Sequence, residues 1–280
     1  MTTTELYAQI QAKKSMLCVG LDTDFNKMPE HIKRLATEGA TAVKGELVNG
    51  TARSLYEFNK AIIDATAAHC VAYKPNLAFY ECYGRDGMLA LEKTVDYLRS
   101  NYPEQFLIAD AKRGDIGNTA KMYAKTFFET MDFDAVTISP YMGSETVTPF
   151  LEYKGKFAIV VALSSNKSSA DFQLAEQDGK PLYQVVMEKM MTISTPENMM
   201  FVVGATKADK LAEIRKFCPD NFFLVPGVGA QGGSAEEVIA HGANAKGGLL
   251  INSSRGVIYA SNEEDFAEAA ARAAATTANL

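Results

Sequence analysis

Short apolar runs alternate with longer amphipathic stretches along most of the chain. The runs are apolar at successive positions, which is typical of strands buried on both faces in a parallel sheet covered by helices. We therefore predict eight buried strands over Met16–Asp22, Val71–Asn76, Phe106–Lys112, Ala135–Pro140, Phe157–Ser164, Met200–Ala205, Phe222–Gly229 and Gly248–Ser253.

The stretches between these runs have helical periodicity. They predict helices over Gly50–His69, Gly87–Asn101, Asn118–Glu129, Tyr183–Thr192, Asp209–Cys218, Ala235–His241 and Glu263–Thr277. Eight strands with helices between them favour an α/β fold, a closed (β/α)8 TIM barrel, with a doubly wound open sheet as the alternative. At 280 residues and 47% hydrophobic content, we expect a single domain over residues 1–280.

One connection is unusually long. Residues 23–49 separate the first strand from its helix and are rich in charged and turn-forming residues. Long connections of this kind are either functional flaps or tolerated surface insertions, and the pattern does not decide between them.

Composition limits the partners and the location. The net charge of −6 argues against nucleic acid or an anionic membrane as a partner, because both select for excess Lys and Arg. No apolar run approaches the roughly 18 residues of a membrane span. The four cysteines form no CxxC pair, and three lie in or beside apolar runs, which predicts reduced thiols and a cytoplasmic location.

Polar residues gather where the predicted strands end, which is the edge at which barrel enzymes hold their sites. Asp110 and Lys112 are spaced i and i+2, so a regular strand would point both to the same side, and Asp115 follows in the loop. Lys74 and Asn76 repeat this spacing on the preceding strand. Because an opposite charge nearby favours the ionised form of a side chain, a cluster of alternating aspartates and lysines can stay charged. The cluster is therefore a candidate catalytic centre, with a structural salt-bridge network as the alternative.

A glycine-rich segment, residues 226–233, follows the seventh predicted strand and matches GxGxxG. A dinucleotide site would need an acidic residue about 20 positions on, and Asn252 stands there. In a barrel, the loops after strands seven and eight commonly bind phosphate, and Arg255 after the eighth strand suits bidentate phosphate contact. Two purely structural turns are the alternative.

Other reactive side chains have no chemical pattern. His31, His69 and His241 lack the spacing of a shared metal site, so we expect them to be structural. The aromatic run at residues 79–83 and the methionines at 190, 191, 199 and 200 are typical of packing. No PLP lysine, thiamine motif or metal triad is visible.

Taken together, these motifs resemble the orotidine 5′-phosphate decarboxylase family, and specifically its longer bacterial branch. The resemblance covers about Val19 to Ile258 and is carried, in family order, by Lys74-Pro75-Asn76, by Asp110-Ala111-Lys112-Arg113-Gly114-Asp115-Ile116-Gly117 with Thr119, by the segment 226–233 and by Arg255. One departure is Ser254, which stands where many members have glycine.

The resemblance implies decarboxylation of orotidine 5′-phosphate to UMP, the last step of de novo UMP synthesis, in a homodimer without cofactor or metal. It implies a charged tetrad of Lys74, Asp110, Lys112 and Asp115, with Lys112 as proton donor and with Asp115 and Thr119 serving the opposite subunit. Asp22 would bind ribose, and either Ser164 or Ser165 the pyrimidine. The full substrate-binding set would be Asp22, Asn76, Thr119, Ser164, Ser165, Pro226, Gln231, Gly232, Ser254 and Arg255, with Gln231 and Arg255 holding the phosphate.

Two rival functions remain. A magnesium-dependent sugar-phosphate decarboxylase or aldolase of the same barrel suprafamily shares the Asp-x-Lys-x-x-Asp core, but it would need acidic metal ligands where this chain has Lys74-Pro75-Asn76. A catalytically silent barrel that binds nucleotides as a regulator is the other, and the intact tetrad argues against it.

Overall fold

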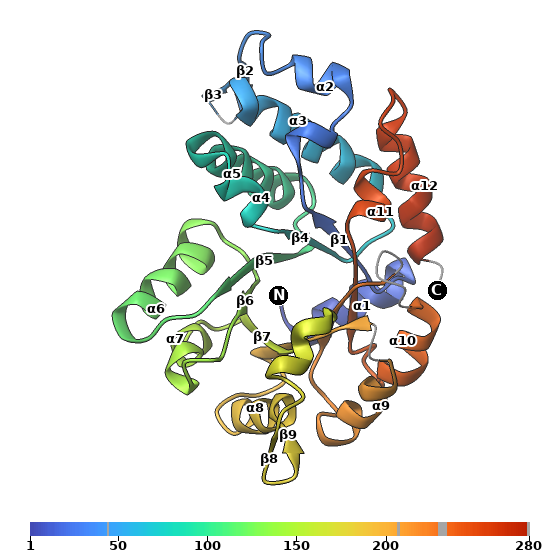
Figure 1. Ribbon diagram of the computed structural model, residues 1–280. Helices are drawn as coiled ribbons and strands as arrows, with labels where there is room; N and C mark the ends of the chain where they lie inside the picture. Colours follow the sequence, from blue (N-terminus) through green and yellow to red (C-terminus); the bar gives the residue numbers. More distant parts are fainter. Residues whose placement is uncertain (44, 206–207, 229–233, 279–280) are drawn as a thin grey trace.

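The computed structural model describes residues 1–43, 45–205, 208–228 and 234–278. Eight parallel strands form a closed barrel, seen with its helices around it in Figure 1. The strands are β1 (Leu17–Leu21), β4 (Ala72–Pro75), β5 (Phe106–Arg113), β6 (Ala135–Ile138), β7 (Phe157–Leu163), β10 (Met199–Val203), β11 (Phe223–Pro226) and β12 (Leu249–Ser253). Because β1 pairs with both β4 and β12, the predicted TIM barrel is confirmed and the open sheet is wrong.

Helices follow most of the strands, as the periodicity predicted. The longer ones are α1 (Thr3–Lys13), α3 (Gly50–Thr66), α5 (Gly84–Asn101), α6 (Gly117–Lys125), α8 (Leu182–Met191), α9 (Ala208–Phe217), α10 (Ala235–Gly242) and α12 (Phe266–Ala278). The short ones are α2 (Glu30–Arg34), α4 (Ala78–Glu81), α7 (Thr148–Leu151) and α11 (Arg255–Ile258), with 3₁₀ turns η1 (Phe25–Lys27), η3 (Ser144–Thr146) and η4 (Lys167–Asp171). The helix predicted over Asn118–Glu129 is α6 continued by a π-helical turn, η2 (Thr126–Thr130).

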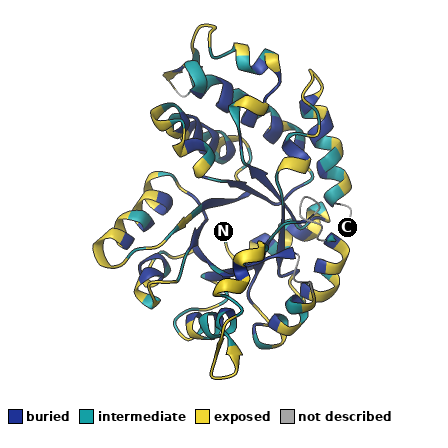
Figure 2. Ribbon diagram, viewed as in Figure 1, coloured by how far each residue is buried: buried dark blue, intermediate teal, exposed yellow. Residues whose placement is uncertain are grey.

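Two apolar cores account for strands that are apolar on both faces. One fills the barrel interior with side chains such as Cys18, Ile108 and Leu250, and the other packs the outer faces of the strands against the helices. Figure 2 shows the barrel strands buried over most of their length and the helices exposed on their outer faces. The interior is thus a packed core, which leaves only the strand ends free to form a site.

Helix α1 was not among the predicted helices. It contributes Leu6 and Ile10 to the barrel interior core, so it closes one end of the barrel. A capping box between Thr2 and Glu5 begins the helix. That Thr-x-x-Glu spacing was the available sequence signal for it.

The long connection after β1 folds into η1, α2 and an antiparallel hairpin of β2 (Thr41–Val43) and β3 (Glu46–Val48). A second small hairpin, β8 (Glu176–Gln177) with β9 (Lys180–Pro181), precedes α8. The first hairpin is fixed to α5 by an ion pair between Glu46 and the buried Lys93, 2.7 Å apart. None of the described residues 25–49 lines the cavity at the carboxyl ends of the barrel strands, which is described below.

All four cysteines are free thiols, as predicted. Cys18, Cys70 and Cys218 are buried and Cys82 is exposed. Burial raises the pKa of Cys70 to about 12, so this thiol stays protonated and serves as a small apolar side chain. Among the described residues, no helix is long and apolar enough to cross a membrane.

Candidate active site

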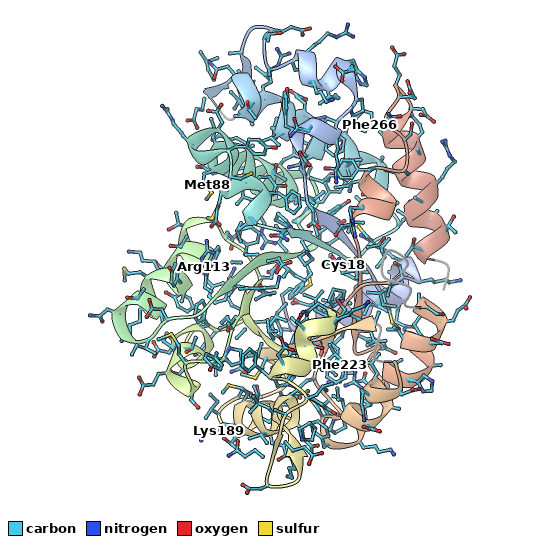
Figure 3. All side chains as sticks on the ribbon, in the orientation of Figure 1. Cys18, Met88, Arg113, Lys189, Phe223 and Phe266 are labelled. Atoms are coloured by element: carbon cyan, nitrogen blue, oxygen red, sulfur yellow. The ribbon has the colours of Figure 1, made fainter. Side chains whose placement is uncertain are left out.

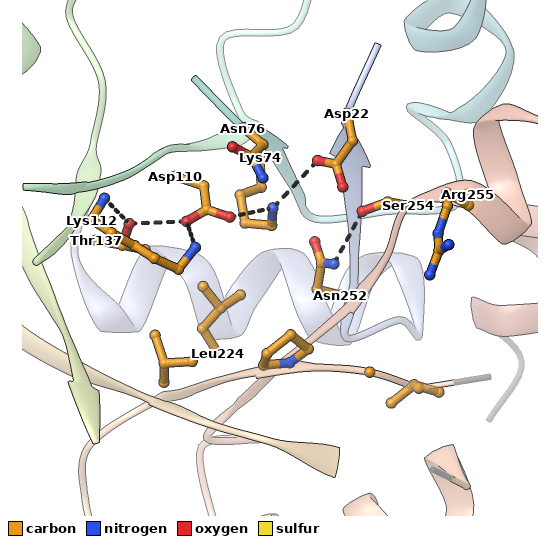
Figure 4. Close-up of a pocket in the computed structure, with 14 residues that line it drawn as sticks. Asp22, Lys74, Asn76, Asp110, Lys112, Thr137, Leu224, Asn252, Ser254 and Arg255 are labelled. Atoms are coloured by element: carbon orange, nitrogen blue, oxygen red, sulfur yellow. Dashed lines mark hydrogen bonds and ion pairs between the residues drawn. The ribbon is translucent and has the colours of Figure 1, made fainter. Parts of the chain in front are cut away.

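A cavity opens at the carboxyl ends of the strands, where the barrel fold places its sites. Figure 4 shows its lining. The lining residues are Asp22, Lys74, Asn76, Asp110, Lys112, Thr137, Val202, Leu224, Pro226, Gly227, Val228, Asn252, Ser254 and Arg255. Eight of the predicted site residues are therefore brought together: Asp22, Lys74, Asn76, Asp110, Lys112, Pro226, Ser254 and Arg255.

One side of the cavity is formed by Lys74, Asp110 and Lys112, which we call the charged wall. Asp110 Oδ2 accepts from Lys74 Nζ at 2.9 Å, and Oδ1 accepts from Lys112 Nζ at 2.5 Å. Lys74 Nζ also lies 3.7 Å from Asp22 Oδ1. The side chains of Lys74 and Asp110 are only 4% and 9% exposed, whereas that of Lys112 is 54% exposed. Charges therefore alternate across the wall, as the sequence predicted.

The ion pairs keep the buried groups charged. Burial opposes ionisation of Asp110, but the ammonium groups of Lys74 and Lys112 outweigh it, and the pKa of Asp110 lies well below its ordinary value. Burial likewise works against the charge on Lys74, and the carboxylates of Asp110 and Asp22 more than offset it, so the pKa of Lys74 is raised. At neutral pH the wall holds a carboxylate between two ammonium groups.

Lys112 points into the cavity, as predicted, but the backbone conformation that directs it there differs from the predicted regular strand. The i, i+2 argument assumed a regular strand, but the pairing of β5 with β6 shifts register between Ala109 and Arg113. Lys112 there has a left-handed backbone, with φ of +45°. Arg113 pairs instead with Glu81 and lies over the ring of Tyr123, outside the barrel (Figure 3). The irregularity turns Lys112 towards Asp110 and Arg113 away from it.

Asp22 is held by hydrogen bonds to its backbone neighbours. Tyr259 Oη donates to the Asp22 carbonyl at 3.0 Å and accepts from the backbone N–H of Asp24 at 2.7 Å. Tyr80 Oη donates to the Leu21 carbonyl at 3.0 Å. The carboxylate itself has a buried oxygen, Oδ1, without a hydrogen-bond partner in the described part of the chain. The backbone of the segment is thus fixed by hydrogen bonds, while the carboxylate, which lines the cavity, is held among the described residues only by the long ion pair with Lys74.

The opposite side of the cavity, which we call the open end, consists of Pro226, Gly227, Val228, Asn252, Ser254 and Arg255. Arg255 makes no hydrogen bond or ion pair with the other cavity residues drawn in Figure 4. Asn252 donates to Ser254 Oγ at 3.3 Å, while its buried Oδ1 has no partner among the described residues. The Arg255 guanidinium is thus the charged group at this end that a ligand could bind.

Ser254, the departure from the family pattern, fits because residue 20 is glycine. A Cβ on Gly20 would lie 1.9 Å from Ser254 Oγ and 2.8 Å from Ser254 Cβ. Real Cβ atoms do not approach that closely, and since Ser254 Cβ is itself too near, rotating the serine would not make room. The serine side chain therefore occupies volume left by the missing side chain of Gly20.

Six predicted site residues are not seen in this cavity. Asp115 and Thr119 lie beyond the end of β5 and do not line it. Ser164 and Ser165 do not line it either. The Ser164 hydroxyl is hydrogen-bonded to Asn166 and Gln173. The Ser165 backbone packs against Gly204 so closely that a side chain at residue 204 would clash with it. Gln231 and Gly232 lie outside the described residues.

Several lining residues were not predicted from the sequence, and two of them, Thr137 and Asn252, are polar. Each is a buried polar residue on a mostly apolar strand, 1% and 8% exposed respectively. A polar residue at an inward-facing strand position was the signal that could have found them. Val202 and Leu224 form apolar parts of the lining and carried no such signal.

The predicted structural residues lie away from this chemistry. His31 packs against Phe266, and Met190, Met199 and Met200 are buried in the cores. In the described ranges, no three His, Cys, Asp or Glu side chains are grouped as metal ligands would be.

Comparison with known proteins points to one family. The family model described as "Orotidine 5'-phosphate decarboxylase / HUMPS family" matches residues 15–270. A protein named orotidine 5'-phosphate decarboxylase from Phocaeicola vulgatus is 54% identical over 275 residues, 98% of this chain and 95% of that protein. One of the same name from Porphyromonas gingivalis is 53% identical, covering 98% and 94%. The solved structure of Leishmania donovani OMP decarboxylase matches with a TM-score of 0.77 at 35% identity, covering 97% and 95%.

Proposed function

The chain belongs to the orotidine 5′-phosphate decarboxylase / HUMPS family, and from this premise we propose that it converts orotidine 5′-phosphate to UMP and CO2 without a cofactor. This is the last step of UMP biosynthesis. The family model alone does not separate the decarboxylase from its relatives, but the proteins more than 50% identical over nearly the whole chain are named for this activity. The observation that carries the proposal is the charged wall inside the cavity.

The chemistry requires positive charge at one carbon. Loss of CO2 from C6 of the pyrimidine leaves an electron pair in the ring plane, which cannot delocalise into the carbonyl groups, so the protein must stabilise it electrostatically. The Lys112 ammonium is the exposed cation of the charged wall. In this proposal it stabilises the electron pair and then transfers a proton to C6, leaving a neutral amine that solvent reprotonates.

Asp110 and Lys74 support that step. Both oxygens of Asp110 are bound by ammonium groups, so the carboxylate holds Lys112 in place while Lys74 prevents Asp110 from taking up a proton. A carboxylate occupied in this way favours the ammonium-based decarboxylase over the magnesium-dependent rival.

Substrate binding is divided between the two sides of the cavity. Asp22, whose carboxylate lines the cavity, binds ribose hydroxyls, and Asn76 lines the same side and contacts the substrate there. Arg255 binds the phosphate, together with Gln231 and backbone groups near Pro226, Gly232 and Ser254. Ser164 or Ser165 contacts the pyrimidine once the substrate is bound. Remote phosphate binding would then position the ring for reaction.

We also propose a homodimer in the cytoplasm, formed by one domain per chain. Asp115 and Thr119 do not line the cavity of their own chain, which agrees with a role in the partner's site. Large apolar side chains next to them in the sequence are exposed, Ile116 at 42% and Met122 at 58%. Exposed apolar residues gathered in one region are typical of an interface.

The activity is tested with EDTA-treated protein, by following the ultraviolet absorbance of orotidine 5′-phosphate. We expect substrate consumption without added metal, and its loss in Lys112→Ala by about three orders of magnitude or more, with UMP binding retained. No turnover, or turnover only after magnesium is added, would favour one of the rivals.

The shared site is tested by mixing Lys112→Ala with Asp115→Ala subunits, each inactive alone. Heterodimers restore one site with both residues intact, so activity should return towards about a quarter of the wild-type value if exchange is random. Continued inactivity under demonstrated subunit exchange would contradict the interface assignment.

A further inference from the structure

Thr137 is a buried hydroxyl with two partners at the centre of the charged wall. It lies on β6 and is 1% exposed. Its Oγ1 donates to Asp110 Oδ1 at 3.0 Å and accepts from the backbone N–H of Lys112 at 2.9 Å. The hydroxyl hydrogen is thus used by Asp110, so this residue acts on its neighbours and has no donor left for a ligand.

Thr137 stands opposite the irregularity in β5. Ala109 pairs with Val136, and Arg113 pairs with Ile138, so residues 110–112 face the single residue Thr137. An irregularity of this kind interrupts the ladder of backbone hydrogen bonds. The Thr137 hydroxyl supplies an acceptor for the Lys112 N–H within this gap.

The backbone of Lys112 needs such support. Its φ of +45° lies in the left-handed region, which is unfavourable for a residue with a side chain. The strain persists only where surrounding contacts favour it. The bond from the Lys112 N–H to Thr137 is one such contact.

The three residues close a ring of interactions. Asp110 Oδ1 binds Lys112 Nζ, the Lys112 N–H binds Thr137 Oγ1, and the Thr137 hydroxyl returns to Asp110 Oδ1. Lys112 is therefore held at both its backbone and its ammonium group. Since its side chain is 54% exposed, little packing would otherwise restrict it.

We propose that Thr137 is a positioning residue for the decarboxylation, whose hydroxyl holds the Asp110 carboxylate and the Lys112 backbone so that the Lys112 ammonium is directed at the reacting carbon. This inference rests on the function proposed above. It predicts that Thr137 affects the chemical step more than substrate binding, because Arg255 and Asp22 bind parts of the substrate remote from that carbon.

The test is Thr137→Val, which keeps the shape of the side chain and removes the hydroxyl. We expect kcat to fall about 10- to 100-fold, because a hydrogen bond to a charged group is lost. KM and the affinity for UMP should stay within about twofold of wild type. Thr137→Ser, which restores the hydroxyl, should recover most of kcat.

Thr66→Val is the matched control. The Thr66 hydroxyl is fully buried and also makes two contacts, donating to the Ile62 carbonyl at 2.7 Å and lying 2.7 Å from Tyr73 Oη. It lies on α3, away from the cavity. We expect this variant to lose thermal stability and keep the wild-type kcat.

Several outcomes would overturn the inference: an unchanged kcat in Thr137→Val, equal losses in kcat and UMP affinity, no recovery in Thr137→Ser, or an equal loss of kcat in Thr66→Val. Wild-type protein assayed in parallel separates failure of the proposed function from failure of this inference. Absence of wild-type turnover would contradict the proposed function and this inference together, whereas an active wild type with an equally active Thr137→Val contradicts the inference alone.

Discussion

The two sides of the cavity differ in how their polar groups are satisfied. In the charged wall, Lys74, Asp110 and Lys112 are paired with one another without any ligand. At the open end, Arg255 and the Asn252 oxygen make no such contacts with the cavity residues around them. The groups assigned to the chemical step are thus paired within the fold, whereas Arg255, assigned to the phosphate, has no partner among the cavity residues drawn.

This difference has a physical basis. Preorganised charges stabilise a transition state without having to rearrange during the reaction, so their geometry must be set before the substrate arrives. A phosphate-binding group has the opposite requirement, because a partner within the protein would have to be displaced by the ligand. The comparison predicts that changes in the charged wall affect stability and that changes at the open end affect binding.

The largest effect is expected for Asp110→Ala. The variant leaves the buried Lys74 ammonium with only Asp22, 3.7 Å away, and removing one partner of a buried ion pair costs about 3–5 kcal/mol. Urea unfolding would measure the change in the free energy of unfolding. Asp22→Ala is the comparison, since Asp22 is more exposed and farther from Lys74. This variant should lose much less free energy of unfolding than Asp110→Ala. Equal losses of unfolding free energy in the two variants would contradict the claim that Asp110 is the main partner of Lys74.

A smaller effect, on binding, is expected for Arg255→Ala. Loss of a guanidinium–phosphate contact should lower kcat/KM for orotidine 5′-phosphate about 100-fold and leave the free energy of unfolding nearly unchanged. Orotidine, which lacks the phosphate, should react equally slowly with both proteins. Arg272→Ala, which removes an exposed arginine paired with Asp265, is the matched control for a lost positive charge. A large loss of unfolding free energy in Arg255→Ala would show that Arg255 makes stabilising contacts within the protein.

The smallest effect is the pH dependence of stability. The pKa of Asp110 is lowered in the fold, so its contribution is present above the unfolded value near pH 4 and is lost as pH falls through the folded pKa. The pKa of Lys74 is raised, so its contribution is complete below about pH 10.5 and is lost as pH rises through the folded pKa.

Between about pH 5 and pH 10, these two groups should leave stability nearly flat. Unfolding of wild type and Asp110→Asn, compared from pH 3 to pH 10, measures this. The difference between the two proteins should shrink only below about pH 4. A difference that already shrinks at pH 6 would mean that Asp110 is not held as a carboxylate.

The sequence predicted the barrel because its signals are local. Each strand is a run of residues buried on both faces, and Asp22, Lys74 and Asp110 could be assigned to one cavity because the ends of parallel strands meet at one edge. The terminal helix α1 was missed, since Leu6 and Ile10 are too few apolar residues to form a clear period.

Other features depend on contacts between strands. The left-handed backbone of Lys112 follows from the register of β5 against β6, which no pattern within residues 106–113 reveals. The hydrogen bonds of Thr137 with Asp110 and Lys112 likewise exist only because β6 lies beside β5 in this register. Sequence periodicity does not carry such information.

The shared volume of Gly20 and Ser254 limits how this site can evolve. A side chain at residue 20 can be accepted only after residue 254 has lost its own, so Gly20→Ala followed by Ser254→Gly would pass through a disfavoured intermediate, whereas the reverse order would not. Such dependence of one substitution on another is epistasis, and it gives the two positions a preferred order of change. Mutational libraries at this cavity should vary them together.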